Sequence, residues 1–225
     1  MNDWYEIWNN RSINKKPYDM LNLLKLNGHD TNTGSINKED WLNYFKLIYK
    51  KSNINKLDSI YEIGCGAGAF LKIFYDLDHE VSGSDYSKNL LKVIKEIMPN
   101  AFFKNEHANK INTEKKYDIV LANSVFQYFP NYSYADKVLD NMLNKCKKKI
   151  LILDINDYSK KNEMIFLKKE IQPGKINKKY IKHQFYDKNY FEKIALKYGL
   201  LIDIFPQNIN NINSKYRYNV IMEIH

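Results

Sequence analysis

The spacing of apolar residues along the chain changes near residue 58. Before that point, large apolar side chains between Trp41 and Ile48 recur every three or four residues, which predicts a helix over 38–51. After it, short apolar runs alternate with longer amphipathic segments. The runs predict strands at 59–63, 80–84, 101–104, 117–122 and 149–155, and the amphipathic segments predict helices at 67–75, 88–98, 134–146 and 189–198. This alternation indicates a parallel sheet covered on both faces.

The C-terminal part of the sequence departs from this alternation. Two apolar runs, at 200–205 and 216–223, are joined by a short connection without a helical pattern, which suits an antiparallel hairpin. The lysine-rich segment 156–186 shows no clear periodicity, and residues 172–175 within it predict a turn. We therefore expect an α/β fold, a doubly wound sheet of seven strands that ends in an antiparallel hairpin.

Composition narrows the class of protein. With 225 residues, 44% of them hydrophobic, the chain can bury one substantial core, which argues against a disordered or fibrous protein. It shows neither an apolar run long enough to span a membrane nor a secretory signal, so we expect a soluble, cytoplasmic protein. Two cysteines, Cys65 and Cys146, are too few for a disulfide framework or a cysteine-based metal cluster, and no metal is expected.

The net charge of +9 would suit a nucleic acid or an anionic small molecule. However, nearly all of the 35 basic residues are lysine, one of several abundant residue types with AT-rich codons. Arginine, which nucleic-acid-binding proteins use for bidentate contacts, occurs only as Arg11 and Arg217. The basic balance is therefore a weak indication of the partner.

One segment carries a ligand-binding pattern. Gly64, Gly66 and Gly68, three of the eight glycines, follow the first predicted strand and open a helix. Glycine lets the backbone adopt positive φ and approach a ligand closely, and open α/β sheets bind ligands at the carboxyl ends of their strands. Asp85 ends the second predicted strand, where a carboxylate can accept both hydroxyls of an adenosine ribose. An adenosine-containing cofactor is therefore expected.

Two kinds of adenosine cofactor fit this loop. The spacing Gly64-x-Gly66-x-x-Ala69 is acceptable for a dinucleotide-binding fingerprint. Three features weigh against it: Glu62 would bring a second anion to a pyrophosphate, the usual dinucleotide-binding fold lacks a terminal hairpin, and the fourth strand runs into Tyr117–Phe129. Together these features resemble the Rossmann-like class I S-adenosylmethionine-dependent methyltransferases, and the resemblance extends from Leu57 to the C-terminus.

The resemblance implies a methyltransferase domain over 58–225, an N-terminal helical lid over 1–57, S-adenosylmethionine as cofactor and S-adenosylhomocysteine as product. In that family the glycine loop holds the amino-acid end of the cofactor, and the acidic residue after the second strand binds the ribose. An aspartate after the third strand usually contacts the adenine; this chain has Glu106 and His107 there, which leaves that contact open. The cofactor-binding residues implied in this way are Glu62, Gly64, Gly66, Gly68, Asp85, Tyr86, Ser87, Glu106, His107, Asn123 and Ser124.

Four further segments give a narrower resemblance. Residues 4–8, 26–30, 183–188 and 213–219 are similar to segments of small-molecule methyltransferases from bacterial polysaccharide and natural-product clusters. Among these, the chain resembles methyltransferases of capsule modification, including O-methyl phosphoramidate decoration. The resemblance implies O-methylation of a small, anionic, sugar- or nucleotide-linked acceptor, with no nucleic-acid or membrane partner.

The acceptor side offers few candidate residues. His183 could act as a base, bind an oxyanion or bond to nearby backbone, and His29 in the lid could reach the methyl group or serve only the loop. Tyr128 could touch the acceptor or pack on the sheet. Arg217 could hold a phosphate or pair with a carboxylate of the hairpin, and Tyr186 is expected to contact the substrate. An anionic oxygen acceptor would need orienting groups but no base.

Three other functions share parts of this pattern. A nucleic-acid methyltransferase would have the same fold, but Asn123–Phe126 lacks the proline-aromatic motif of enzymes that methylate base amino groups. A module without cofactor would not need the glycine loop and Asp85, and a dehydrogenase would bind NAD. We take methyl transfer to a small molecule as the hypothesis and methylation of RNA or another nucleic acid as its main alternative.

Overall fold

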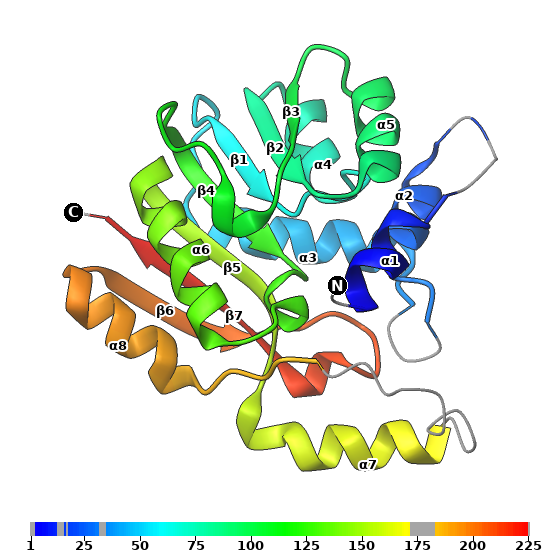
Figure 1. The fold of residues 1–225 in the computed structure, drawn as a ribbon, viewed down its shortest axis with the longest axis vertical. Helices are drawn as coiled ribbons and strands as arrows, with labels where there is room; N and C mark the ends of the chain where they lie inside the picture. Colours follow the sequence, from blue (N-terminus) through cyan, green and yellow to red (C-terminus); the bar gives the residue numbers. More distant parts are fainter. Residues whose placement is uncertain (1–2, 13–15, 17, 32–34, 172–182, 225) are drawn as a thin grey trace.

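A seven-stranded sheet, in the order β3-β2-β1-β4-β5-β7-β6, runs through the computed structural model (Figure 1). The structure describes residues 3–12, 16, 18–31, 35–171 and 183–224. The strands are β1 (Ile60–Ile63), β2 (Val81–Asp85), β3 (Phe102–Asn105), β4 (Tyr117–Asn123), β5 (Cys146–Asn156), β6 (Leu201–Pro206) and β7 (Arg217–Glu223). β1 to β5 pair in parallel, and β7 is antiparallel to both β5 and β6. The predicted doubly wound sheet with its antiparallel C-terminal strands is confirmed.

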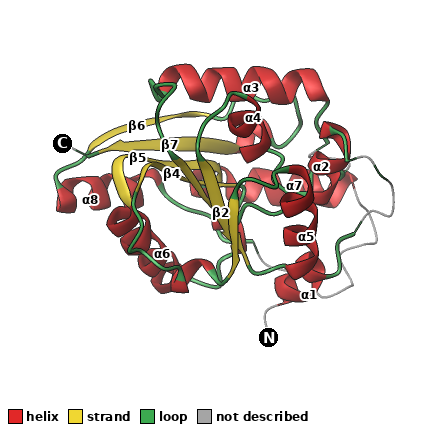
Figure 2. Cartoon of the chain, turned by 90° about the horizontal axis from the view of Figure 1, so that it is seen from above, coloured by secondary structure: helices red, strands yellow, loops and turns green. Residues whose placement is uncertain are grey.

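Helices cover both faces of this sheet. In the described part of the chain they are α1 (Asp3–Asn9), α2 (Met20–Leu26), α3 (Lys38–Lys51), α4 (Leu71–Asp76), α5 (Lys88–Ile97), α6 (Tyr132–Lys145), α7 (Lys161–Ile171) and α8 (Lys188–Tyr198). Figure 2 shows α3 and α4 on one face and α6 and α8 on the other. α4 begins four residues later than predicted, because the intervening residues belong to the glycine loop.

Strand residues alternate between two cores. Along β4, Ile119 and Leu121 face the core shared with α3, α4 and α5, whereas Val120 and Ala122 face the core shared with α6 and α8. Successive side chains of a strand point to opposite faces, so a strand buried on both sides is apolar throughout. This is why the sequence shows short, continuous apolar runs in place of an alternating pattern.

Local signals set the helix ends predicted from sequence. The hydroxyl of Ser87 accepts a hydrogen bond from the N–H of Leu90 at 3.3 Å and caps the N-terminus of α5. Gly199, with φ of 65°, ends α8 in the left-handed conformation that glycine adopts readily. Ser87 lies beside the carboxyl end of β2, whereas Gly199 leads into the start of β6.

The segment 156–186 was predicted to be irregular, and this prediction is wrong for its first half. A short 3-10 helix at Tyr158–Lys160 leads into α7. On α7, Met164 and Leu167 pack on a small apolar cluster with Phe185 and Tyr216. So few apolar residues of α7 face this cluster that the sequence pattern does not reveal a helix. The predicted turn at 172–175 lies outside the described residues.

The N-terminal segment divides between core and site. α3 packs on the sheet through the buried side chains of Trp41, Tyr44 and Ile48. α1 lies beside α5, at the edge formed by the carboxyl ends of the strands (Figure 1). Within the described ranges, no helix combines the length and apolarity that crossing a membrane requires.

Candidate functional site

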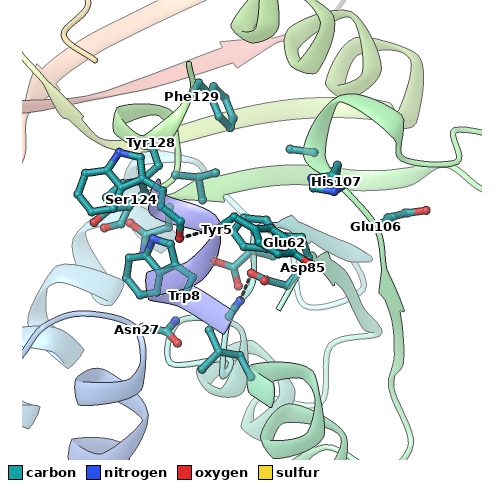
Figure 3. Close-up of a pocket in the computed structure, with 18 of the residues that line it drawn as sticks. Tyr5, Trp8, Asn27, Glu62, Asp85, Glu106, His107, Ser124, Tyr128 and Phe129 are labelled. Carbon is teal, nitrogen blue, oxygen red and sulfur yellow. Dashed lines mark hydrogen bonds between the residues drawn. The ribbon is translucent and has the colours of Figure 1, made fainter. Parts of the chain in front are cut away.

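A cavity of about 490 Å³ lies between the carboxyl ends of the central strands and α1 (Figure 3). This volume is in the range of small-molecule sites. The described residues that line it are Trp4, Tyr5, Trp8, Asn27, His29, Trp41, Glu62, Gly64, Gly66, Asp85, Tyr86, Leu90, Glu106, His107, Ala108, Asn123, Ser124, Val125, Tyr128, Phe129, Pro130 and Tyr134. The predicted site residues are among them with five exceptions: Gly68, Ser87, His183, Arg217 and Tyr186.

The glycine loop needs its glycines for two different reasons. Gly66 has φ of 55°, and a Cβ there would lie 2.7 Å from the side-chain oxygen of Asn27. Gly68 has φ of 86°, and a Cβ there would lie 2.7 Å from side-chain atoms of Ile94 and Met98. Gly66 therefore lets the side chain of Asn27 approach the loop, whereas Gly68 lets the loop pack against α5.

Asn27 is a site residue whose contact the sequence did not predict. Its Oδ1 accepts the N–H of Ala67 at 2.7 Å, and its Nδ2 donates to the carbonyl of Cys65 at 3.4 Å. Asn27 is also the C-cap of α2. An Asn-Gly pair at a helix end signals a cap, but nothing in the sequence indicates that this cap rests on the glycine loop.

Asp85 joins the backbone on two sides of the cavity. One carboxylate oxygen accepts the N–H of Gly66 at 2.9 Å and the other accepts the N–H of Ser87 at 2.7 Å. Burial raises the pKa of Asp85 to about 6, although these N–H donors act in the opposite direction. Each carboxylate oxygen can accept further hydrogen bonds, so Asp85 can still bind hydroxyl groups in the cavity.

Glu62 is buried in the cavity wall with acceptor capacity to spare. Its side chain is 2% exposed, and Oε2 has no hydrogen-bond partner among the described residues. Burial, reinforced by the charge of Asp85, raises the pKa of Glu62 well above its usual range. A buried carboxyl group without a partner is costly, and a ligand with a cationic donor would relieve that cost.

Three aromatic rings gather at the ends of β2 and β3. Tyr5 and Tyr86 stack with ring centroids 5.3 Å apart, and His107 lies 5.7 Å from Tyr86 in a near-parallel orientation. Glu106 is paired instead with Lys104 at 2.9 Å and points away from the rings in Figure 3. A planar base would pack on this flat aromatic surface, to which His107 rather than Glu106 contributes.

The other end of the cavity is also aromatic. The ring centroid of Trp4 lies 4.7 Å from that of Tyr128 and 4.7 Å from that of His183. Trp4 and Tyr128 line the cavity, whereas His183 does not. Burial, together with the charges of Lys168 and Arg217, lowers the pKa of His183 well below its usual range. Burial also raises the pKa of the Tyr128 hydroxyl. Both groups are uncharged at neutral pH, so neither is a strong base.

Of the two roles expected for Arg217, the structure shows the pairing with a carboxylate. Its partner is Asp154 of β5, and the two side chains are 12% and 2% exposed. Asp154 has φ of 62°, at the register shift between β5 and β7. Its carboxylate also accepts hydrogen bonds from Ser124 and Gln207. The pair thus supports the loop after β4 from behind the cavity.

Two more of the predicted site residues that do not line the cavity, Tyr186 and Ser87, have other structural roles. Tyr186 is fully buried, and its hydroxyl donates to the carbonyl of Phe126 at 3.0 Å. The structure thus places the side chain of Tyr186, predicted to contact a substrate, in the core and not in the wall of the cavity. Ser87 is buried as the cap of α5, and its hydroxyl donates to the carbonyl of Trp8 at 3.0 Å. His29 does line the cavity, with its ring 4.8 Å from that of Trp41.

Metal-ligating and nucleophilic groups are not features of this site. In the part of the chain that the structure describes, no three His, Cys, Asp or Glu side chains are grouped to hold a metal ion. Cys65 and Cys146 are buried, free thiols. Burial raises the pKa of both, that of Cys146 to about 11. An un-ionised thiol is a poor nucleophile, so Cys65 acts as a small packing residue in the glycine loop.

Sequence comparisons find a similarity in the region that contains the glycine loop. The profile of a family described as a methyltransferase domain matches residues 61–149. Protein 235L of Invertebrate iridescent virus 6, which is named as a methyltransferase, is 29% identical over 116 residues. The match covers 48% of this chain and 43% of the viral protein, so the chain spans less than half the length of this curated relative.

Solved structures share the fold over most of the chain. Magnesium protoporphyrin IX methyltransferase from Synechocystis PCC 6803, with bound S-adenosylmethionine, has a TM-score of 0.58 at 13% identity and matches 98% of this chain and 88% of its own. A methyltransferase from Clostridium acetobutylicum has a TM-score of 0.62 at 13% identity, and the match covers 84% of this chain and 93% of the other protein. The N-methyltransferase NodS from Bradyrhizobium japonicum has a TM-score of 0.62 at 11% identity, and the match covers 91% of this chain and 97% of NodS. Identities this low show a common fold.

Proposed function

We propose that the chain methylates a small-molecule acceptor, because residues 61–149 match a family described as a methyltransferase domain and the fold is shared with S-adenosylmethionine-dependent methyltransferases. The observation that carries the proposal is the order of groups along the cavity. An unpartnered carboxyl group, Glu62, lies at the glycine loop, and Asp85 stands beside the stacked rings of Tyr5 and Tyr86. These groups suit an amino acid, a ribose and an adenine in turn.

The residues present fit the cofactor. S-adenosylmethionine supplies a methyl group that is already activated by a positively charged sulfur. Glu62 would accept hydrogen bonds from its amino group, and the positive charge would favour the ionised form of this carboxyl group. Asp85 would accept the ribose hydroxyls, and Tyr86 and His107 would pack on the adenine. The aromatic face of Tyr128 suits the cationic sulfur.

The contribution of the protein to the transfer would be alignment and exclusion of water. Trp4, Trp8 and Tyr128 enclose the end of the cavity beyond the glycine loop. His183 and Tyr128 are weak bases there. An acceptor oxygen that is already ionised carries no proton for them to remove. We propose O-methylation of an anionic acceptor for this reason.

The resemblance to capsule-modifying methyltransferases gives a more specific acceptor. We propose a sugar- or nucleotide-linked precursor that carries a phosphoramidate or a related anionic group. The net charge of +9 favours an anionic molecule of this kind. One structural neighbour is named as a methyltransferase of magnesium protoporphyrin IX, which is also a small molecule.

We propose that the lid expected for residues 1–57 consists of α1 and α2. The Tyr86 hydroxyl donates to the carbonyl of Trp4 at 3.2 Å, and the Ser87 hydroxyl donates to the carbonyl of Trp8 at 3.0 Å. Asn27 ends α2 on the glycine loop. The helices are thus attached to the loops that would hold the cofactor, and their closure would exclude water from the transfer.

Thermal unfolding of the full chain tests the cofactor. We expect S-adenosylhomocysteine and S-adenosylmethionine to raise the unfolding temperature, because a ligand at about 100 times its Kd stabilises a protein by roughly 2.7 kcal/mol. NAD is the matched control, since it shares the adenosine. Stabilisation by NAD, or by none of the three, would contradict the proposed function. Radiolabelled methyl transfer to nucleotide sugars, phosphoramidates and RNA then separates the proposed acceptor from the nucleic-acid alternative.

Asp85→Asn should weaken binding of S-adenosylhomocysteine by about tenfold or more, because hydrogen bonds to a charged group contribute about 1.5–3 kcal/mol. Since the pKa of Asp85 is raised to about 6, the affinity of the wild type should rise with pH across that value as the carboxylate forms. Calorimetric titration at several pH values should show this rise in the wild type and its loss in the variant. Asp203→Asn, at an exposed ion pair with Lys51, is the control and should bind like wild type.

The same shift has a consequence for stability. The folded-state pKa of Asp85 lies above the usual value of 3.8 for an aspartate, so the folded state holds its proton at pH values where the unfolded chain has lost it. The free energy of unfolding should therefore fall as the pH rises from about 4 to about 6, by this group's contribution. Urea unfolding of wild type and Asp85→Asn across that window should show the difference, and equal pH profiles would contradict the shift.

A further inference from the structure

A group of cationic side chains lies behind the acceptor end of the cavity. The apolar cluster of Met164, Leu167, Phe185 and Tyr216 joins α7, the segment before α8 and the start of β7. Lys168 follows Met164 by four residues and so lies on the same face of α7. His183 stands two residues before Phe185, and Arg217 directly follows Tyr216. The cluster therefore brings together the three segments that carry these residues, and the charges of Lys168 and Arg217 both act on the ring of His183.

The charge of Lys168 is not balanced within this group. Asp154 neutralises Arg217 through their buried ion pair. Lys168 is half-buried, and both its burial and the nearby Arg217 lower its pKa, to about 8. No carboxylate among the described residues offsets these effects on Lys168. The group thus has one positive charge in excess, held where water reaches it only in part.

The neighbouring groups can also donate hydrogen bonds. Nε of Arg217 is buried and has no partner in the described part of the chain. The ring of His183 contacts Trp4 and Tyr128, at 4.7 and 5.5 Å between centroids. Trp4 and Tyr128 in turn line the cavity, and Figure 3 shows the place of Tyr128. His183 therefore directly contacts two side chains that line the acceptor end of the cavity.

We infer that Lys168, His183 and Arg217 form a binding site for a phosphate-type oxyanion carried by the methyl acceptor, with Lys168 as its main charge. This inference rests on the proposed function, since it assigns one part of the acceptor to one place in the site. The described residues that line the cavity include three carboxylates, Glu62, Asp85 and Glu106, but no lysine or arginine. Positive charge for an anionic acceptor is thus found beyond Tyr128, on the side away from the cofactor-binding loop. Lysine suits this role because it binds phosphate as a point charge.

The experiment uses the full chain saturated with S-adenosylhomocysteine and titrated with inorganic phosphate at constant ionic strength. Binding is followed by tryptophan fluorescence, because Trp4 contacts His183, and by calorimetry. We expect saturable phosphate binding that Lys168→Met weakens by about tenfold or more. Lys169→Met is the matched control: it removes the same charge from the next, exposed residue of α7 and should leave binding unchanged. Lys168→Arg should restore most of the affinity.

The outcomes separate this inference from the proposed function. Equal phosphate affinity in the Lys168→Met and Lys169→Met variants, or no saturable binding to wild type, would overturn the oxyanion site. Binding of S-adenosylhomocysteine, measured separately for each variant, should be unchanged. If it is retained while phosphate binding is absent, only the oxyanion site fails; if S-adenosylhomocysteine does not bind at all, the proposed function fails first. Thermal unfolding of each variant without ligand verifies that α7 remains folded.

Discussion

Arg217→Met should lower the free energy of unfolding by about 3–5 kcal/mol, because it leaves the buried charge of Asp154 without its partner. Asp154 is 1% exposed and would retain only the neutral donors Ser124 and Gln207. A buried charge that loses its counter-ion costs far more than an exposed one. Urea unfolding at neutral pH measures this loss. The dependence of the free energy of unfolding on urea concentration is fitted separately for each protein, and a common slope is used only where the two fitted slopes agree.

A second variant identifies the cause of this effect. Asp154→Asn combined with Arg217→Met removes both charges and should recover most of the lost stability. Glu223→Gln is a control on the same strand, since it breaks the partly exposed ion pair between Lys149 and Glu223 and should cost less than about 1 kcal/mol. If Arg217→Met proves as mild as this control, the pair is not the buried support that the geometry indicates.

Gly66→Ala should weaken the binding of S-adenosylhomocysteine by about a hundredfold, or roughly 3 kcal/mol. A left-handed φ of 55° strains any residue with a Cβ, and this Cβ would lie 2.7 Å from Oδ1 of Asn27. Asn27 is held there by the N–H of Ala67, so it cannot yield without releasing the loop. The N–H of Gly66 also donates to Asp85, and a displaced loop would move the proposed ribose ligand as well.

Gly199→Ala separates backbone strain from contact. Gly199 has φ of 65°, similar to that of Gly66, but a Cβ there would meet nothing within 4 Å. This variant should therefore lose about 1–2 kcal/mol of stability from the left-handed conformation alone and bind S-adenosylhomocysteine like wild type. Calorimetry and urea unfolding on both variants provide the comparison. Equal cofactor affinity in the two proteins would show that the glycine loop tolerates a side chain at Gly66.

The parts of the fold that could be predicted from sequence are those dictated by local pattern. β1, β4 and the second half of β5 are buried on both faces, so each appears as a largely apolar run, and the glycine loop with Asp85 is recognisable from spacing alone. α7 could not be predicted, because only Met164 and Leu167 of this helix pack on the cluster at its face. Its stability depends on contacts with residues that are distant in sequence, which periodicity does not report.

The same distinction applies to the site. Glu62 lies near the end of β1, Asp85 ends β2 and Ser124 follows β4, so topology places them at one edge of the sheet. The contacts of Asn27 and Lys168 depend on how α2 and α7 dock, and a single sequence contains no measure of docking. Arg217 shows a third case: its rarity in a lysine-rich chain marked it as special, but only the structure reveals its partner, Asp154.

The position of β7 has a consequence for how the chain folds. β7 is the last strand in sequence, yet it lies between β5 and β6. Until β7 pairs, β5 presents an open edge and β6 has no neighbour in the sheet, whereas β1 to β4 can already pair around the glycine loop. During synthesis, the half of the sheet that bears the glycine loop can therefore form while the other half is still incomplete, with an apolar edge exposed to aggregation. Arg217 arrives with β7, so its buried pair with Asp154, which supports the loop after β4, forms only after the half of the sheet that bears the glycine loop can form.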